Sequence, residues 1–457
     1  MAIFGRCARV DRTAMGGQPP EMKRRNRGAK CNGSGQRVRQ SPPMKQPESL
    51  KRLGPGLISG AADDDPSGIA TYSQAGAQFG YSMLWTMVFT YPLMVGIQIV
   101  SARIGHLTGR GLAANIRAVF PRPVLLATIA LLVVANTINI AADIAAMGEA
   151  LRLITGGSAH LFAVVFGIVS LALQIFIPYE RYVRLLKWLT LALLAYVAVV
   201  FTVRIDWEQV ALRTVMPSFG VNSASITMIV AIFGTTISPY LFFWQATQEA
   251  QDARGERSGA PEDAENARSH LRRIKWDTYI GMGFSNLVAY FIILSTATTL
   301  NAAGITEIQT AAQAAEALRP VAGELTFILF AAGIVGTGML AVPVLAGSAA
   351  YAVAEAFDWK TGLDRKLFEA REFYALVSFA TLGGVGLIFS EIDPIKALLW
   401  SAIINGFIAV PIMAVMMLLA QRADVMGDFV ITGRLRVLGW SATTVMAIVV
   451  VAMLVTL

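Results

Sequence analysis

Three consecutive carboxylates, Asp63, Asp64 and Asp65, stand within an apolar stretch and are followed at once by Pro66. At the centre of a membrane helix each Asp costs roughly 2.5 to 3.5 kcal/mol, so three must be neutralised by protons, water or a bound cation. We expect at least one of them to bind a cation, and Asp65 is the best placed because it adjoins the proline. Alternatively, Asp65 caps a half-helix that begins at Pro66, but that role leaves Asp63 and Asp64 unexplained.

A second polar interruption, at residues 234–240, also contains a proline, Pro239. Proline has no N–H, and its ring clashes with the carbonyl four residues earlier. Pro66 therefore frees the carbonyl of Ala62, and Pro239 frees that of Thr235. In lipid both oxygens need a partner within the protein, and a cation held between the two interruptions would satisfy both. The alternative is an ordinary kink healed by a water or a hydroxyl group.

The composition of the whole chain is that of a polytopic membrane protein. Of its 457 residues, 55% are apolar and 15% are charged, against roughly 25% charged in an ordinary soluble domain. A membrane core takes about 20 apolar residues per helix. A window of that length predicts an all-α protein with eleven transmembrane helices, near residues 53–78, 82–104, 124–147, 160–178, 186–203, 224–248, 277–300, 324–354, 373–390, 396–420 and 437–457.

The first and sixth predicted helices carry the two interruptions. Because these helices are five apart, the spacing predicts two five-helix repeats of inverted topology, at about residues 53–203 and 224–420, followed by an extra helix at about residues 437–457. Matched interruptions near the membrane midplane are the best sequence pointer to the substrate site of a transporter.

Residues 1–52 differ from the rest of the chain. This segment holds 13 of the 38 Lys and Arg residues and both cysteines, Cys7 and Cys31, and it has no apolar run. It is predicted to be a disordered basic tail and not a signal peptide. The transmembrane domain, residues 53–457, therefore contains no cysteine ligand.

The distribution of basic residues predicts the orientation in the membrane. With the N-terminus in the cytoplasm, 33 of the 38 Lys and Arg residues lie on the cytoplasmic side, as the positive-inside rule requires. The positive net charge thus reflects sidedness and does not indicate a nucleic-acid partner. An odd number of helices places the C-terminus outside a bacterial-type inner (plasma) membrane.

Several motifs resemble the Nramp family of divalent-metal transporters. The sequence Asp65-Pro66-Ser67-Gly68 stands where that family has Asp-Pro-Gly-Asn, and Ser238-Pro239-Tyr240 stands where it has Met-Pro-His. The similarity continues through Gln74-Ala75-Gly76, Phe79-Gly80-Tyr81, Leu84-Trp85, Ser101-Ala102-Arg103, Thr108-Gly109-Arg110, Ala142-Asp143 and Met426-Gly427-Asp428-Phe429. The resemblance covers residues 53–457 and implies eleven or twelve helices, LeuT-like inverted repeats and a cytoplasmic N-terminus.

The resemblance also implies a metal site, but with two departures. The family's Asn is Gly68 here and its Met is Ser238, so one amide and the only thioether are missing. A thioether favours softer transition metals, whereas oxygen ligands suit Mg²⁺, Ca²⁺ and Mn²⁺, and Mg²⁺ usually keeps several waters. This pattern looks like the Nramp-related magnesium transporter branch. Alternatively, Ser238 only packs beside a site that stays selective for Mn²⁺. The candidate ligands are Asp65, Ala62, Thr235, Ser238, Gly68 and Asp64.

The proton pathway is also incomplete by the same comparison. Typical members have His at the positions of Tyr240 and Gln245, and a Glu three residues after Asp143, where this chain has Ala146. We therefore expect uptake driven by the metal gradient and the membrane potential, without proton coupling. The candidate pathway residues are Asp63, Tyr240, Gln245 and Asp143. Interhelical hydrogen bonding is the commoner role of the other polar residues in spans, such as Asn136, Asn139, Gln174, Asn286 and Asn405.

The sequence thus predicts a secondary transporter for divalent cations, with Mg²⁺ or Mn²⁺ as substrate, and neither an enzyme nor a cofactor-binding protein. A proton-coupled Mn²⁺/Fe²⁺ transporter of the typical Nramp kind is the first alternative. An organic-substrate transporter of the same architecture is disfavoured because three aspartates would oppose a substrate carboxylate. A channel or a metal sensor is the third alternative.

Overall fold

The computed structural model describes residues 54–177, 191–218, 220, 222–256, 264–360, 362, 367–389 and 393–456. Every regular element among these residues is helical, as predicted. The predicted basic tail, residues 1–52, lies outside the described residues, and so do both cysteines.

The helices of the chain's first half begin with a short pair and continue with longer elements. They are α1 (Pro55–Asp63), α2 (Pro66–Phe79), α3 (Leu84–Thr108), α4 (Leu112–Val119), α5 (Arg122–Thr155), α6 (Ala159–Phe176), α8 (Leu194–Val199) and α9 (Trp207–Val215). A 3-10 turn, Gly80–Met83, joins α2 to α3. Gly80 has a φ of 55°, a backbone conformation that glycine adopts without strain.

The second half begins with another interrupted pair. Its helices are α10 (Ser223–Thr236), α11 (Pro239–Glu256), α12 (Ala264–Thr296), α13 (Ala311–Glu316), α14 (Arg319–Ala322), α15 (Thr326–Ala356), α16 (Arg371–Leu387), α17 (Pro394–Ala420), α18 (Ala423–Met426) and α19 (Gly433–Thr456). Four of these helices carry or adjoin the site described below, namely α10, α11, α12 and α17.

Eight helical stretches among the described residues are long and apolar enough to cross a membrane. They are Pro66–Thr108, Arg122–Thr155, Ala159–Phe176, Ser223–Gly255, Glu265–Asn301, Arg319–Ala356, Pro394–Ala420 and Gly433–Thr456. Helices also lie in the other predicted ranges, as α1, α8 and α16, but α16 has 17 residues and the range 186–203 begins outside the described residues. The count of eleven spans and the inverted repeats stay predictions.

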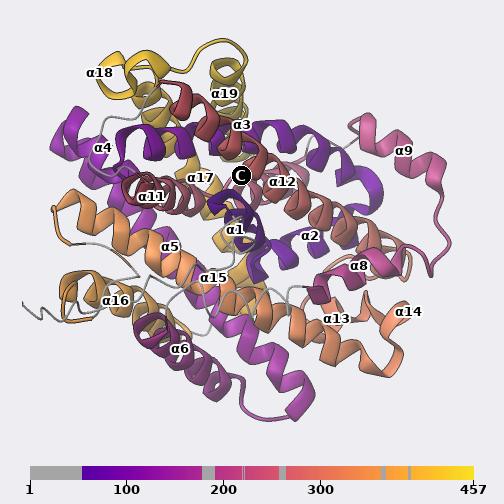
Figure 1. The fold of residues 1–457 in the computed structure, drawn as a ribbon. Helices are drawn as coiled ribbons and strands as arrows, with labels where there is room; N and C mark the ends of the chain where they lie inside the picture. Colours follow the sequence, from indigo (N-terminus) through magenta and orange to yellow (C-terminus); the bar gives the residue numbers. More distant parts are fainter. Residues whose placement is uncertain are drawn as a thin grey trace, which may run out of the picture. The chain divides into compact units, whose positions relative to one another are not determined.

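Helix α1 packs along one face of α12. The carboxylate of Asp277 accepts a hydrogen bond of 2.7 Å from the N–H of Gly56, at the start of α1. Further along, Gly60 lies so close to Gly281 that a Cβ at Gly60 would overlap the Gly281 carbonyl. At the far end of α1, Ser285 contacts the carboxylates that close the helix. In Figure 1, α1 lies in the middle of the view, near α2, α11 and α12.

The second interrupted pair is held against α17 in a similar way. A Cβ at Gly234 would overlap the carbonyl of Ala402 and the backbone of Gly406 in α17. Both interruptions therefore lie against neighbouring helices at close backbone contacts, which small residues permit. The long helices around them fix where each interruption can point.

Candidate metal-binding site

The two interruptions have the same backbone plan. Helix α1 ends at Asp63 and α2 begins at Pro66, so two residues separate the half-helices. Helix α10 ends at Thr236 and α11 begins at Pro239, again with two residues between. Each proline occupies the first position of the following half-helix, where its missing N–H costs no helical hydrogen bond. The prediction that the first and sixth ranges are broken is confirmed.

Asp65 begins the second half of the first interrupted pair and is buried. Its Oδ1 accepts a hydrogen bond of 2.7 Å from the N–H of Gly68, which makes it the N-cap of α2. Its Oδ2 accepts a bond of 3.0 Å from the side-chain amide of Asn139 in α5. The capping role expected as an alternative is therefore present, and it leaves both carboxylate oxygens with lone pairs to spare.

The two carbonyls freed by the prolines each accept a hydrogen bond from a hydroxyl group, which is the alternative that the sequence left open. The hydroxyl of Tyr240 donates to the carbonyl of Ala62 at 3.0 Å. The hydroxyl of Ser238 donates to the carbonyl of Thr235 at 2.6 Å and to that of Gly234 at 3.0 Å. The physical reason is that both hydroxyls sit within the second interruption itself, where they can reach the carbonyls without any bound ion.

Asp63 and Asp64 face a different helix from Asp65. The hydroxyl of Ser285 in α12 lies 2.7 Å from Oδ2 of Asp63 and 3.0 Å from Oδ1 of Asp64. One hydroxyl has one proton, so it can donate to only one carboxylate at a time. Among the described residues no three acidic, His or Cys side chains gather closely enough to hold a metal ion. Asp63 and Asp64 therefore contact α12, whereas Asp65 contacts α5.

Gly68 lies between the two interruptions. A Cβ built on Gly68 would come within 3.2 Å of the Thr235 hydroxyl and 3.3 Å of the Asp63 carbonyl. A side chain at this position would therefore point from the first interruption toward the second. The neighbouring Ser67 hydroxyl donates to the carbonyl of Leu398 in α17 at 3.2 Å.

Asp143 lies on α5, one turn beyond Asn139, and is fully buried. Neither of its carboxylate oxygens makes a well-formed hydrogen bond with the described residues, although the backbone N–H of Ser67 lies near them. Because Asn139 contacts Asp65, the spacing of four residues puts Asp143 on the same face of α5. The structure thus brings this predicted pathway residue close to the site.

Gln245 lies away from the interruptions. Its side-chain oxygen accepts a bond of 2.6 Å from Gln98 in α3, and its amide donates to Thr278 in α12 at 3.0 Å. These contacts fit the interhelical role that buried amides usually have. Tyr240, in contrast, reaches the first interruption through Ala62.

Two residues that contact the aspartates were not singled out as ligands or pathway residues by the sequence. Asn139 was one of several polar residues for which a hydrogen-bonding role was expected, and it has such a role toward Asp65. Ser285 had no signal beyond being a polar residue in an apolar helix. Its distance of 222 residues from Asp63 explains why no local pattern pointed to it.

A comparison with known protein families shows which family this chain belongs to. The family model described as natural resistance-associated macrophage protein-like, Nramp, matches residues 56–456. This chain belongs to the Nramp family. The match spans both interruptions of this Nramp protein and agrees with the resemblance found in the motifs. It supports a multi-pass membrane transporter and not an enzyme.

Two curated relatives of this Nramp protein are called divalent metal cation transporter MntH. The chain is 28% identical over 409 residues to the protein of Klebsiella pneumoniae (strain 342), covering 88% of this chain and 92% of that one. It is 28% identical over 393 residues to the protein of Acidiphilium cryptum (strain JF-5), covering 83% and 84%. Each match therefore covers most of both chains.

Solved structures show the same fold. The Eremococcus coleocola manganese transporter superposes with a TM-score of 0.69 at 18% identity, covering 89% of this chain and 86% of that one. Mhp1, a nucleobase-cation-symport-1 family transporter in a closed conformation, gives a TM-score of 0.53 at 15% identity, covering 88% and 92%. The fold of this Nramp protein is therefore shared with transporters of different substrates.

Proposed function

We propose that this protein transports divalent metal cations across a membrane, with the ion held between the two interruptions at Asp65. The observation that carries the proposal is a buried carboxylate between two broken helices. In the part of the chain that the structure describes, no Lys or Arg forms an ion pair with it. A buried charge without a partner is costly, and a bound cation would supply one. The names of the MntH relatives and of the manganese transporter support this substrate class.

The proposed ligands are oxygens that lie at the two interruptions. Asp65 would bind through its carboxylate, and the carbonyls of Ala62 and Thr235 would bind when the hydroxyls of Tyr240 and Ser238 turn aside. Each such exchange replaces a hydrogen bond worth about 1 kcal/mol by an ion contact. Asp64 and Gly68 are also in the proposed set, Asp64 by attracting a hydrated ion and Gly68 by leaving room for water. Ser238, the remaining candidate ligand, takes part through its hydrogen bond to the Thr235 carbonyl.

For the identity of the metal we propose Mn²⁺ together with hydrated Mg²⁺. Support comes from the side chains at positions 68 and 238: neither offers nitrogen or sulfur, and oxygen donors suit both ions. The relatives described above are named for divalent metal cations and for manganese, so the magnesium assignment rests on the side chains at positions 68 and 238. Selectivity for Mn²⁺ alone is the competing possibility.

We propose further that uptake is not coupled to protons. Neither Tyr240 nor Gln245 is a His, each donates a hydrogen bond to a neighbouring oxygen, and Ala146 has no group that can carry a proton. A divalent ion that crosses the full membrane field gains about 4.6 kcal/mol per 100 mV, twice the value for one charge, so no proton is needed energetically. A proton-coupled Mn²⁺/Fe²⁺ transporter remains the alternative, and the buried Asp143 is the residue that favours it.

The membrane placement is proposed from the charge count. We place the protein in a bacterial-type inner membrane with residues 1–52 in the cytoplasm and the C-terminus outside. An organic substrate is disfavoured because the first interruption offers carboxylates where a substrate carboxylate would need helix N-termini.

The deciding experiment is uptake of Mn²⁺ and Mg²⁺ into proteoliposomes with a pH dye inside. We expect uptake of both ions, driven by an imposed negative potential, without matching acidification. Absence of uptake of any divalent ion would refute the proposed function. Stoichiometric acidification would refute only the uncoupled mechanism, and rejection of Mg²⁺ would refute only the magnesium assignment.

A further inference from the structure

Helix α12 has one row of side chains that faces away from the rest of the protein. The apolar members of this row follow at steps of four and three residues, which keep them on one side of the helix. They are Trp276 (62% exposed), Ile280 (62%), Phe284 (47%) and Leu287 (52%). Since the helix is also long and apolar enough to cross a membrane, this row contacts the acyl chains of lipid.

Basic side chains continue the same row before Trp276. Arg272 lies one turn before Trp276 and Arg268 one turn before Arg272, and both are exposed. Lys275 is exposed as well, and its ammonium group lies 5.7 Å from the centre of the Tyr279 ring. Trp and Tyr are common at the boundary between hydrocarbon and headgroups. The row therefore places its cations at the level of the lipid headgroups.

These three cations have no anionic partner within the described part of the chain. No ion pair there includes Arg268, Arg272 or Lys275. Arg273 is different, because its guanidinium lies 3.6 Å from the carboxylate of the buried Glu249 in α11. The positive charge of the row is thus open to an anion from outside the chain.

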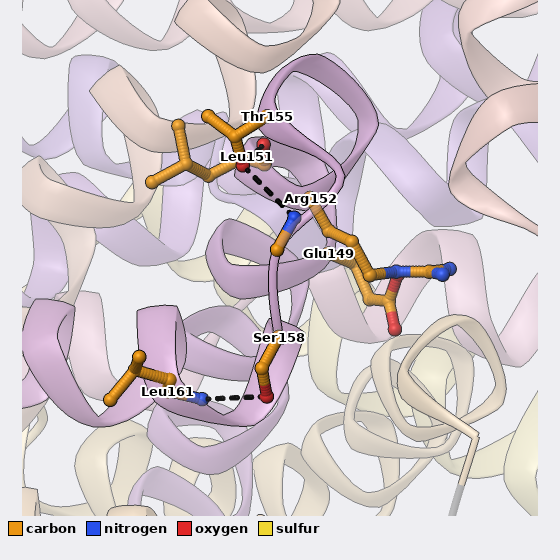
Figure 2. Close-up of polar contacts among 7 residues, drawn as sticks. Glu149, Leu151, Arg152, Thr155, Ser158 and Leu161 are labelled. Carbon is orange, nitrogen blue, oxygen red and sulfur yellow. Dashed lines mark hydrogen bonds and ion pairs between the residues drawn. The ribbon is translucent and has the colours of Figure 1, made fainter.

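The exposed arginine at the turn between α5 and α6 is arranged differently. Arg152 lies 2.7 Å from the carboxylate of Glu149, three residues earlier. Figure 2 shows the two side chains beside each other at the end of α5, while the Ser158 hydroxyl caps α6 across the turn. This arginine has its anion within the chain, so we expect no bound anion at this turn.

We propose that Arg268, Arg272 and Lys275 bind the headgroup of an anionic phospholipid, whose acyl chains lie along Ile280 and Phe284. The charge count places this end of α12 at the cytoplasmic leaflet. Basic clusters directly cytoplasmic of a membrane helix are typical of sites for anionic lipids, and a guanidinium group binds phosphate through two parallel hydrogen bonds. The inference goes beyond the proposed function and does not depend on which ion is transported.

The same helix holds the first half-helix of the metal site. In the row next to the exposed one, Asp277 accepts a hydrogen bond from Gly56 of α1, and Ser285 contacts Asp63. A bound headgroup holds the start of α12 in the place where α1 packs against it. We therefore expect anionic lipid to stabilise the folded protein.

The main test follows Trp fluorescence in bilayers of phosphatidylcholine that contain brominated lipid, which quenches a nearby indole. For each protein, the quenching that Trp276→Phe removes reports the lipid beside Trp276. We expect brominated phosphatidylglycerol to be preferred there over brominated phosphatidylcholine. Arg272→Gln with Lys275→Gln should lower this preference about 25-fold, at about fivefold for each basic side chain near the headgroup. An unchanged preference would overturn the proposal.

A matched pair at another helix serves as the control. Arg434 and Arg436 are exposed at the start of α19, where the nearest tryptophan, Trp440, is only partly exposed. Arg434→Gln with Arg436→Gln removes the same charge and should leave the lipid preference at Trp276 within about twofold. An equal loss in the two double variants would show a general effect of net charge and would refute a site on α12.

Two further measurements separate a lipid from a soluble anion and binding from stability. Free glycerol phosphate has the phosphate without acyl chains, so it should leave the quenching unchanged, and displacement of the lipid by it would contradict a lipid site. The unfolding temperature should rise when phosphatidylglycerol replaces part of the phosphatidylcholine, and it should rise less in Arg272→Gln with Lys275→Gln. An equal rise in both proteins would overturn the stabilising role of the headgroup.

Discussion

The two interruptions share a backbone plan but use the residue before the proline in opposite ways. In the first, Asp65 turns forward and accepts the Gly68 N–H at the start of the next half-helix. In the second, Ser238 turns back and donates to the carbonyls of Thr235 and Gly234 at the end of the preceding half-helix. One interruption therefore presents a charged acceptor, and the other satisfies its own carbonyls.

This difference shows that a proline alone does not create a free ligand. It removes one backbone hydrogen bond, and the freed carbonyl then takes the nearest available donor. A Met at position 238 would have no proton to give, whereas Ser238 donates its proton to the carbonyl of Thr235. In the proposed function the serine therefore removes a soft ligand and occupies a hard one. The second interruption is uncharged, and its own serine already donates to its carbonyls. In the proposed function an ion has to displace that hydroxyl.

The largest effect should come from removing the charge of the first interruption. Asp65→Asn should reduce uptake at least about 100-fold, since the loss of a ligand exceeds the 10- to 100-fold cost of losing a ligand's supporting partner. Asn is also a good N-cap, so stability should be retained, whereas Asp65→Ala should lose about 1 kcal/mol as well. Uptake assays and thermal unfolding would separate the two effects. Wild-type uptake by Asp65→Asn would show that the site lies elsewhere.

The next effect should come from making both interruptions like those of typical family members. Gly68→Asn with Ser238→Met should favour Mn²⁺ or Cd²⁺ over Mg²⁺ by about tenfold, which corresponds to about 1.4 kcal/mol. The new side chain at position 68 requires the Thr235 hydroxyl, 3.2 Å from its Cβ, to move slightly. Competition uptake and calorimetry would measure the shift. No gain in Cd²⁺ binding would contradict the assigned positions.

A smaller effect is expected from the hydrogen bond that joins the two interruptions. Tyr240→Phe should raise metal affinity a few-fold, because the Ala62 carbonyl no longer has to release a hydroxyl worth about 1 kcal/mol. The variant should unfold at a slightly lower temperature for the same reason. Calorimetric titration with Mn²⁺ would detect the change, and a large loss of affinity would indicate that the phenol itself binds the ion.

The smallest effect is expected within the second interruption. Ser238→Ala should change uptake by no more than about twofold and lower the free energy of unfolding by about 1 kcal/mol or less, since one proton is shared between two carbonyls. Transport and denaturant unfolding of this variant would be compared with Tyr240→Phe. A tenfold or larger loss of uptake would mean that the serine hydroxyl is itself a ligand.

The sequence alone determined the helical class and both interruptions. The reason is that apolar length, proline and capping residues act within one or two helical turns. Helix α2 begins at Pro66, as the capping role of Asp65 predicted, and α11 begins at the proline of the second interruption, Pro239. The sequence also identified Asp65 as the carboxylate next to the first interruption. The predicted count of eleven spans stays a prediction, because α1 and α16 are shorter than the helical stretches that are long enough to cross a membrane.

Only the tertiary structure decided which groups meet at the site. Tyr240 reaches Ala62 across 178 residues, Ser285 reaches Asp63 across 222, and Asn139 reaches Asp65 across 74. A hydrogen bond forms only within about 3.5 Å and at a suitable angle. Such contacts depend on how the helices pack against one another, for example at Gly60 and Gly281, and no local spacing in the sequence fixes that packing.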